Sequence, residues 1–143
     1  MFADLTSAHL LNKKSVDDLN ERLKVKDVQV SIHNFRPNIV LETTPYAEDE
    51  WDWVKIGDVV FQLVKPCTRC VLTTINPETG IKNEQAEPLK TLRQYHILEN
   101  LELRKIENYA PVMGLNLGVK QAGIVHVGDE VWVTKNSSIK VMK

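Results

Sequence analysis

The stretch IGDVVFQLV, residues 56–64, begins with a Gly-Asp turn and continues into a run of β-branched, aromatic and aliphatic residues. Glycine and aspartate favour tight turns, whereas valine and phenylalanine favour strands, so this stretch predicts a strand that starts just after a turn. The stretch VGDEVWV, residues 127–133, repeats the pattern near the other end of the chain. Two similar turn-strand units predict a barrel-like sheet at the centre of the fold.

Further strands are expected on the N-terminal side of residues 56–64. Residues 28–32 alternate apolar and polar side chains, which is the period-two pattern of a half-buried strand. Residues 38–41 predict another strand, which begins after a proline has broken the previous one. The segment FRPN, residues 35–38, then forms the corner between these two strands.

Two short helices are expected outside the sheet. Residues 15–24 place apolar side chains at helical spacing, and Ser15 followed by Asp18 resembles the capping box that begins many helices. Residues 88–95 predict a second helix, which a proline opens. Residues 100–123 have weak periodicity, and we expect a long loop with some strand there. The predicted fold class is therefore α+β with β dominant: a barrel-like sheet with a few short helices.

The composition argues against several classes of protein. Residues 1–143 fit a single domain that can bury a core without disulfides or metals. With 18 basic and 19 acidic side chains, no excess positive charge is available for nucleic acid or an anionic membrane. Two cysteines are too few for a secreted disulfide scaffold, no apolar run reaches about 18 residues, and the chain opens without a basic, hydrophobic leader. We therefore expect an intracellular protein with no nucleic-acid partner and no transmembrane or targeting segment in this chain.

The cysteines of PCTRCVLTTINPETG, residues 66–80, are the first candidates for chemistry. A Cys-x-x-Cys pair can be a redox disulfide, half of a zinc site, or one reactive thiolate with a bystander. A thioredoxin-type pair begins a helix, whereas the β-branched run VLTTI predicts a strand here. Zinc needs two further ligands, and the four histidines stand singly in the sequence. Two inert thiols packed in a sheet are the plain alternative.

Arg69 lies between Cys67 and Cys70 and favours a functional interpretation of the pair. Its guanidinium, next to the hydroxyl of Thr68, makes the local electrostatic field positive, which favours a thiolate. The guanidinium can also donate two parallel hydrogen bonds to an anionic group. A soft metal ion or an oxyanion is the ligand that suits a thiolate beside a guanidinium.

A second polar cluster lies at the FRPN corner, where Arg36 and Asn38 flank a proline that fixes the turn. A solvated turn without a ligand is the alternative interpretation. Because Arg36 and Arg69 are both expected at strand ends, one anionic ligand could bridge them, although the spacing does not require it.

The segments FADLTS, SVDDLN, NFRPNIV, YAEDEWDWVKIGDV, PCTRCVLTTINPETG and VGDEVWV occur in the order and at the spacing of the MOSC domain. The chain resembles this family over almost its whole length. The domain is shared by the C-termini of molybdenum cofactor sulfurases and by the mitochondrial amidoxime-reducing component. The resemblance is greatest to the amidoxime-reducing branch, whose signature combines the FRPN corner, the acidic YAEDxW stretch and the block C-x-R-C-x-L-T-T-x-x-P-x-T-G.

The resemblance implies a molybdenum-pterin enzyme in which a protein thiolate completes the coordination of the metal. By position this metal ligand and catalytic-site residue is Cys70, which anchors and tunes the metal, whereas Cys67 is not a ligand. Arg69 would help to keep the sulfur of Cys70 ionised. The family's cofactor-holding positions fall on Arg36, Asn38, Thr68 and Arg69, and its pterin-facing N-terminal stretch falls on Asp4, Thr6 and Ser7.

The resemblance also implies reduction of N-hydroxylated small molecules such as amidoximes. The sequence has no flavin or nicotinamide fingerprint, so a cytochrome b5-type or iron-sulfur protein is implied as the electron donor. A competing hypothesis is a non-catalytic carrier of molybdenum cofactor or sulfur, and a third is a domain that binds no cofactor. The family is further associated with pyridoxal phosphate binding.

The chain departs from the family in length. Full-length relatives carry a preceding β-rich region that supplies part of the phosphate-binding surface, whereas this chain starts at the second half. We therefore expect reduced cofactor affinity, and little turnover until that region is restored. Mitochondrial relatives also have a membrane anchor and bacterial relatives a ferredoxin domain, so both a cytoplasmic and a mitochondrial location stay open.

Overall fold

The computed structural model describes residues 6–135 and 139–143. Within this part of the chain, six strands form one sheet: β1 Ala8–Asn12, β2 Ile39–Leu41, β3 Trp51–Ile56, β4 Val59–Thr68, β5 Val112–Gln121 and β6 Val131–Lys135. The α-helices are α1 Lys13–Leu23, α2 Leu89–Tyr95 and α3 Leu101–Ile106. Short 3₁₀ helices connect these elements: η1 Lys24–Lys26, η2 Ile32–Phe35, η3 Ala47–Glu50 and η4 Val71–Thr74.

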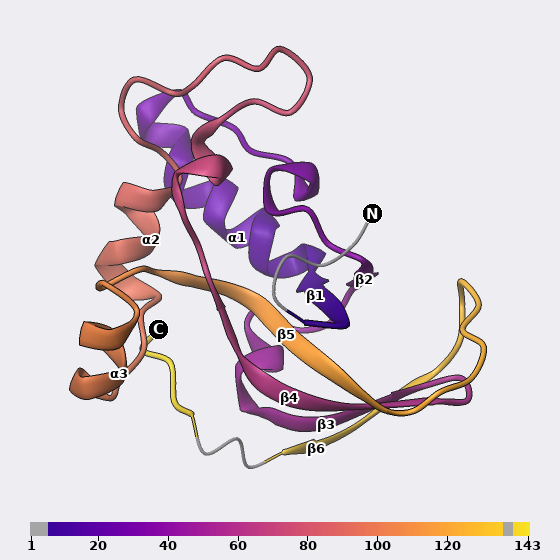
Figure 1. The fold of residues 1–143 in the computed structure, drawn as a ribbon. Coiled ribbons are helices and arrows are strands. Elements are labelled where there is room, and N and C mark those ends of the chain that lie inside the picture. Colours follow the sequence, from indigo (N-terminus) through magenta and orange to yellow (C-terminus); the bar gives the residue numbers. More distant parts are fainter. Residues whose placement is uncertain (1–5, 136–138) are drawn as a thin grey trace.

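The sheet is curled, and its strand order is β2-β1-β5-β4-β3-β6 (Figure 1). Strands β1 and β2 are parallel, and the other neighbouring strands are antiparallel. The helices gather at one end of the molecule, while the hairpin of β3 and β4 extends with β5 and β6 toward the other (Figure 1). The predicted β-dominant α+β fold is confirmed as an open, six-stranded half-barrel with few helices.

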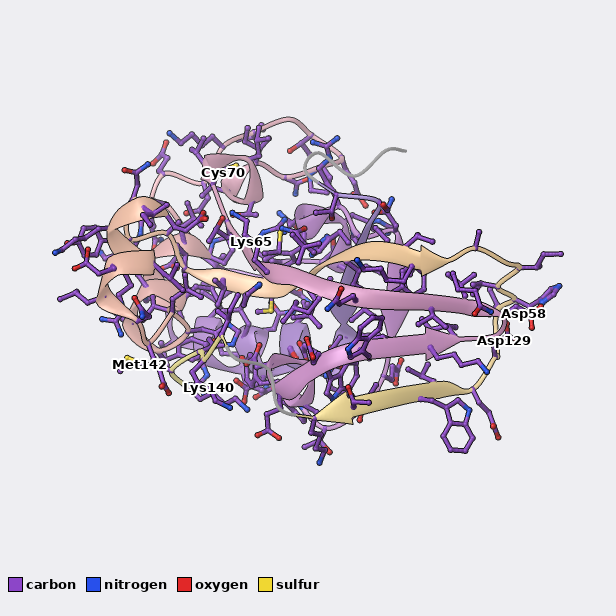
Figure 2. All side chains as sticks on the ribbon, turned by 60° about the horizontal axis from the view of Figure 1, so that its bottom comes forward. Asp58, Lys65, Cys70, Asp129, Lys140 and Met142 are labelled. Atoms are coloured by element: carbon purple, nitrogen blue, oxygen red, sulfur yellow. The ribbon has the colours of Figure 1, made fainter. Side chains whose placement is uncertain are left out.

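Both Gly-Asp turns begin strands, as predicted. Gly57 and Asp58 connect β3 to β4. Gly128 and Asp129 lie just before β6, which begins at Val131. Asp58 and Asp129 lie together at the tip of the extended end (Figure 2). Gly57 has a φ of +53°, and a Cβ atom there would lie 2.5 Å from Oδ2 of Asp129. Glycine is therefore needed at this position because two turns meet there.

Helix α1 begins two residues earlier than predicted, because Asn12 and not Ser15 is its N-cap. The side-chain oxygen of Asn12 accepts a hydrogen bond from the backbone of Lys14 at 3.1 Å. The hydroxyl of Ser15 is fully buried and donates to the carboxylate of Glu48 at 2.7 Å. The predicted apolar face of the helix is buried in the core through Val16, Leu19 and Leu23.

The strand predicted at residues 28–32 is wrong. The side chain of Asn20, on α1, accepts a hydrogen bond from the Val30 N–H at 2.9 Å and donates one to the Val30 carbonyl at 2.8 Å. The backbone groups that a neighbouring strand would use are therefore bonded to a helix. The alternation reflects the burial of Val30 in the core with α1, and the FRPN corner connects η2 rather than a strand to β2.

Residues 100–123 do not form the predicted long loop, because they contain α3 and the strand β5. This strand pairs with both β1 and β4, and its first six residues are all buried. A strand covered on both faces shows no alternation, which removes the sequence signal. Gly114 interrupts the pattern further: its φ is +80°, and a Cβ atom there would lie 2.6 Å from Nε2 of His9.

The curled sheet has an apolar core on each face. Leu10 and Leu11 are consecutive residues of β1 and belong to different clusters of buried side chains, as the alternation along a strand requires. The cluster that contains Leu11 includes the buried side chains of α1, so it lies on the helical side. Among the described residues, no helix is long and apolar enough to cross a membrane.

Candidate functional site

The two cysteines lie where β4 ends. Figure 2 places Cys70 and Lys65 at one end of the molecule and Asp58, which precedes the same strand, at the other. Cys67 is the penultimate residue of β4 and is half-buried, whereas Cys70 lies beyond the strand and is exposed. Cys70 is thus available to a ligand without any change of the fold.

The segment after Cys70 is the 3₁₀ helix η4 and not the predicted strand. The backbone N–H and the hydroxyl of Thr73 both donate to the carbonyl of Cys70, at 3.1 and 2.9 Å. The hydroxyl of Thr74 donates to the carbonyl of Val71 in the same way, at 2.7 Å. These threonines favour a tight turn over a strand because their hydroxyls bond to nearby backbone.

Arg69 is bonded on several sides. Its Nη1 donates to Sγ of Cys67 at 2.8 Å, its Nη2 donates to the carbonyl of Phe35 at 2.7 Å, and its backbone N–H donates to the carbonyl of Pro111 at 2.8 Å. The third guanidinium nitrogen, Nε, is buried and has no hydrogen-bond partner within the described residues. An unpaired buried donor is costly, so Nε marks a place where an acceptor atom of a ligand fits.

The guanidinium of Arg69 contacts Cys67 directly, through the hydrogen bond from Nη1 to Sγ. Burial nevertheless raises the pKa of the Cys67 thiol above its ordinary value, and the charge and hydrogen bond of Arg69 offset this only in part. Cys67 is therefore a protonated thiol at neutral pH. Its sulfur holds the guanidinium in place rather than acting as a thiolate.

His9 lies on β1 against the same guanidinium. Its Nε2 is 3.4 Å from Nη1 of Arg69, and burial, followed by the charge of Arg69, lowers the pKa of His9 to about 4. The ring is therefore neutral at physiological pH. Since a guanidinium can only donate, Nε2 is the nitrogen that accepts and Nδ1 carries the hydrogen.

The FRPN corner contacts both Arg69 and His9. Arg36 is exposed and has a φ of +54°, in the left-handed region. The side-chain oxygen of Asn38 accepts a hydrogen bond from the His9 N–H at 2.8 Å, and the Asn38 N–H donates to the His9 carbonyl at 2.9 Å. Because Phe35 accepts from Arg69, the two arginine-bearing segments do meet.

Thr68 faces a different neighbour. Its hydroxyl donates to Oε2 of Glu107 at 2.9 Å, and Lys65 donates to Oε1 of the same carboxylate at 2.5 Å. The hydrogen bond from Lys65 is the main reason that the pKa of Glu107 lies below its ordinary value. Thr68 can offer a ligand only the lone pairs of its oxygen while this arrangement holds.

The predicted N-terminal stretch is described only in part. Thr6 donates through its hydroxyl to the carbonyl of Ala8 at 3.1 Å, and Ser7 is exposed. Asp4 lies outside the described residues. The contribution of these three residues to a ligand site stays a prediction.

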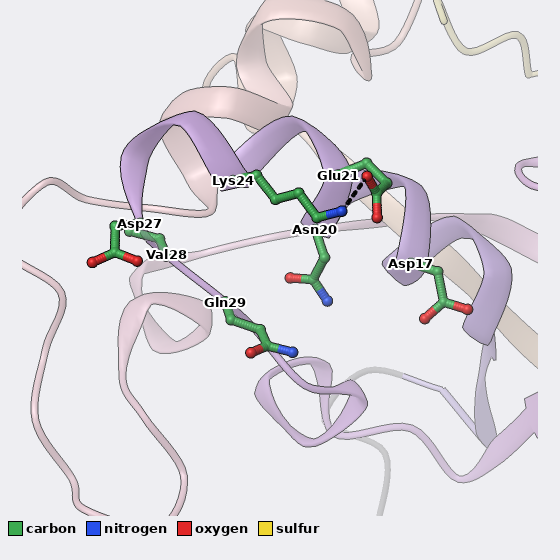
Figure 3. A pocket seen from close by; sticks show the side chains of 7 residues that line it. All are labelled: Asp17, Asn20, Glu21, Lys24, Asp27, Val28 and Gln29. Atoms are coloured by element: carbon green, nitrogen blue, oxygen red, sulfur yellow. Dashed lines mark hydrogen bonds and ion pairs between the residues drawn. The ribbon is translucent and has the colours of Figure 1, made fainter.

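A cavity of about 440 Å³ lies beside the corner, lined by His33, Arg36, Pro37, Pro77 and Glu78. It lies between the FRPN segment and the turn that contains Pro77 and Glu78. Another cavity of about 440 Å³ lies at α1, where Lys24 is paired with Glu21 at 2.6 Å (Figure 3). Its lining includes no residue of the Cys70 or Arg36 segments, so it is separate from the candidate site.

His9 and Glu107 contact candidate residues, and Asn34 connects the segments that carry them, but none of the three was predicted. A single polar residue inside the apolar run AHLL was the available signal for His9. Asn34 precedes the FRPN corner and donates to the carbonyls of Thr73 and Ile75, but its partners lie far along the chain. Glu107 lies in a stretch with weak periodicity, and nothing in the sequence connects it with Thr68.

Comparison with known proteins identifies the family of the chain. The MOSC domain family model matches residues 1–132. The chain is 40% identical over 133 residues to "Mitochondrial amidoxime-reducing component 1" of Homo sapiens, 40% identical over 132 residues to that of Xenopus laevis, and 39% identical over 132 residues to "Mitochondrial amidoxime reducing component 2" of Rattus norvegicus. Each match covers 92% of this chain but only 37–38% of the relative, so the chain spans less than two fifths of their length. With its matching motifs and fold, the chain belongs to the MOSC domain family.

Proposed function

We propose that this chain is the molybdenum-cofactor-binding domain of an oxidoreductase that reduces N-hydroxylated substrates such as amidoximes. The observation that carries the proposal is the buried, unpaired Nε of Arg69, one residue before the exposed thiol of Cys70. Family membership and the names of the relatives support it.

The donor set suits an anionic group that needs a soft ligand. Arg69 and Arg36 supply positive charge, and charge-assisted hydrogen bonds from arginine are among the strongest available to a phosphate. Cys70 supplies a sulfur atom, which is the ligand type that suits molybdenum in a thiolate-rich site. In this proposal the residues that would hold the cofactor are Arg36, Asn38, Thr68, Arg69 and Cys70, with Thr6, Ser7 and Asp4 at the N-terminal side.

When bound, the cofactor would supply two-electron redox chemistry. The side chains around the site determine the chemical environment of the cofactor. Cys67 stays a neutral thiol bonded to Arg69, so it does not compete with Cys70 as a ligand. His9 stays neutral against the same guanidinium, so the charge of Arg69 is available to an anion.

The cavity beside Arg36 offers a place for a small substrate. Pro37 and Pro77 give it rigid walls, while His33 and Glu78 are the titratable groups in its lining. Polar groups of this kind orient the polar end of a substrate and can transfer a proton at its hydroxyl oxygen. We assign the orientation of the substrate and the transfer of the proton to His33 and Glu78 together.

We propose a cytochrome b5-type or iron-sulfur protein as the electron donor. The location, in the cytoplasm or in the mitochondrion, follows that of the donor. The association of the family with pyridoxal phosphate stays a prediction.

The test is metal analysis of the protein purified from a host that makes the cofactor. We expect molybdenum in the wild-type chain and in Cys67→Ser, and its loss from Cys70→Ser. The two cysteine variants are matched because they lie three positions apart and differ in the same atom. Equal loss from both variants would show a paired-thiol site and contradict the proposal. Full molybdenum occupancy without reduction of a model amidoxime by a chemical reductant, both in this chain and in a chain with the upstream region restored, would contradict the enzyme and favour the carrier hypothesis.

A further inference from the structure

The carboxamide of Asn34 joins two segments of the candidate site. Its Nδ2 donates to the carbonyls of Thr73 and Ile75, both at 3.2 Å. Its Oδ1 accepts from the backbone N–H of Ser31 at 2.9 Å, which closes a capping box at the start of η2. Both hydrogens of the amide therefore bind residues 70–75, called the Cys70 turn below. The amide oxygen binds the backbone of Ser31, on the segment that leads into the FRPN corner.

These bonds belong to a closed ring. Cys70 accepts from Thr73 through its carbonyl, Thr73 accepts from Asn34, and Phe35, the next residue after Asn34, accepts from Arg69, which is covalently joined to Cys70. Thr73 is 1% exposed, so its hydroxyl and carbonyl cannot exchange these partners for water. The ring fixes Cys70 relative to the corner from two directions.

The segments on either side of the ring need such a connection. The helices η2 and η4 have four residues each, and 3₁₀ helices of this length have little stability of their own. A ligand held by Cys70 on one segment and by Arg36 on the other requires a constant separation between them. Small displacements of such groups are costly to binding and catalysis.

We propose that Asn34 and Thr73 are positioning residues that set the Cys70 turn against the FRPN corner. Neither residue needs to touch the ligand. The consequence for the cofactor rests on the function proposed above, whereas the effect on the Cys70 turn can be measured in the protein without cofactor.

Asn34→Asp and Thr73→Val test this proposal with nearly unchanged side-chain shapes. The first replaces an amide by an acid that faces two carbonyl oxygens, and the second removes only the hydroxyl. Asn20→Asp is the matched control, because the Asn20 amide also bridges backbone groups, those of Val30, away from the site. Thr73→Ser keeps the hydroxyl and should therefore behave like the wild type in the measurements below.

The first measurement is amide hydrogen exchange over residues 70–75 in the cofactor-free chain. We expect exchange there to be about tenfold faster in Asn34→Asp and Thr73→Val than in the wild type, and unchanged in Asn20→Asp and Thr73→Ser. The second is molybdenum content, which should fall about fivefold in the same two variants. If residues 70–75 exchange at the wild-type rate in both folded variants, the proposal is overturned.

The two measurements separate this inference from the proposed function. Faster exchange in a chain that never binds molybdenum would support the positioning role and contradict the cofactor site. Equal molybdenum content and equal exchange in all variants would overturn the positioning role and leave the cofactor site standing. Faster exchange over the whole chain, in Asn20→Asp as much as in Asn34→Asp, would also overturn the positioning role, because the ring would then be an ordinary structural contact.

Discussion

Two buried polar clusters of this protein differ in how completely their groups are bonded. Around α1 and η3, the Glu48 carboxylate accepts from Asn12 and Ser15, and Asp49 lies 2.8 Å from Nε2 of His96, whose Nδ1 lies 2.6 Å from the Val112 carbonyl. Around Arg69, the Nε has no partner among the described residues. The first cluster is complete without a ligand, and the second is not.

The difference distinguishes a polar cluster that stabilises the fold from one that can bind a ligand. Polar groups that are buried and fully paired stabilise a particular arrangement of the chain, and removing one partner exposes the other to a large desolvation cost. A buried donor that is left unpaired lowers stability and is explained when a ligand completes it. We therefore assign the Glu48 and Asp49 cluster to the fold and Arg69 to binding.

Asp49→Ala should have the largest effect on stability. Both ring nitrogens of His96 face oxygen atoms, and His96 is fully buried. Without Asp49 a buried ring nitrogen loses its hydrogen-bond partner and a cavity is left in its place, so we expect the free energy of unfolding to fall by about 3–4 kcal/mol. Urea denaturation measures this, with Asp49→Asn as the control that keeps the shape and one acceptor. A loss below about 1 kcal/mol would show that the contact between Asp49 and His96 is not a major source of stability.

The pH dependence of stability should show the next largest effect, through His9. Its pKa is about 4 in the folded chain and 6.5 in the unfolded chain, so the unfolded state binds the proton first as the pH falls. The stability present above pH 6.5 is lost as the pH falls toward 4, by about 3 kcal/mol.

The measurement is the difference in unfolding free energy between the wild type and His9→Leu from pH 7 to pH 4. This difference cancels the other titrating groups. It should change in favour of the variant across this window, and a constant difference would contradict the neutral, buried ring.

The sequence predicted the parts of the fold whose signals are local. The Gly-Asp turns, residues 38–41 and the helix that Pro88 precedes are specified by neighbouring residues, and all three predictions are confirmed. The strand predicted at residues 28–32 failed because the partner of Val30 is a side chain of α1. The strand β5 was expected only as some strand within a long loop, because burial on both faces leaves no alternation to detect.

The sequence proposed the candidate site residues one by one, and that proposal stays a prediction, whereas their arrangement came only from the structure. The motif identified Arg36, Arg69 and Cys70, and the structure brings the Arg36 and Arg69 segments into contact through Phe35. No sequence pattern states that Arg69 donates to Cys67, because that bond depends on where β4 ends. The contact with His9 depends on the pairing of β1 with β5 and on the close approach at Gly114.

The smallest effect on stability, and the most direct test of the account, is expected for Arg69→Lys. Lysine keeps the positive charge but loses the fork and the Nε donor. The free energy of unfolding should fall by only about 1–2 kcal/mol, since lysine can replace at most one of the hydrogen bonds that the guanidinium donates to Cys67 and Phe35. Arg93→Lys, on the exposed face of α2, is the matched control.

The decisive measurement is molybdenum retained per folded molecule in the wild type, Arg69→Lys and Arg93→Lys, each purified from a host that makes the cofactor. We expect Arg93→Lys to match the wild type and Arg69→Lys to retain about tenfold less, which corresponds to about 1.4 kcal/mol of binding free energy. Equal retention in Arg69→Lys and the wild type, with both folded, would contradict the claim that the unpaired Nε of Arg69 is completed by the cofactor.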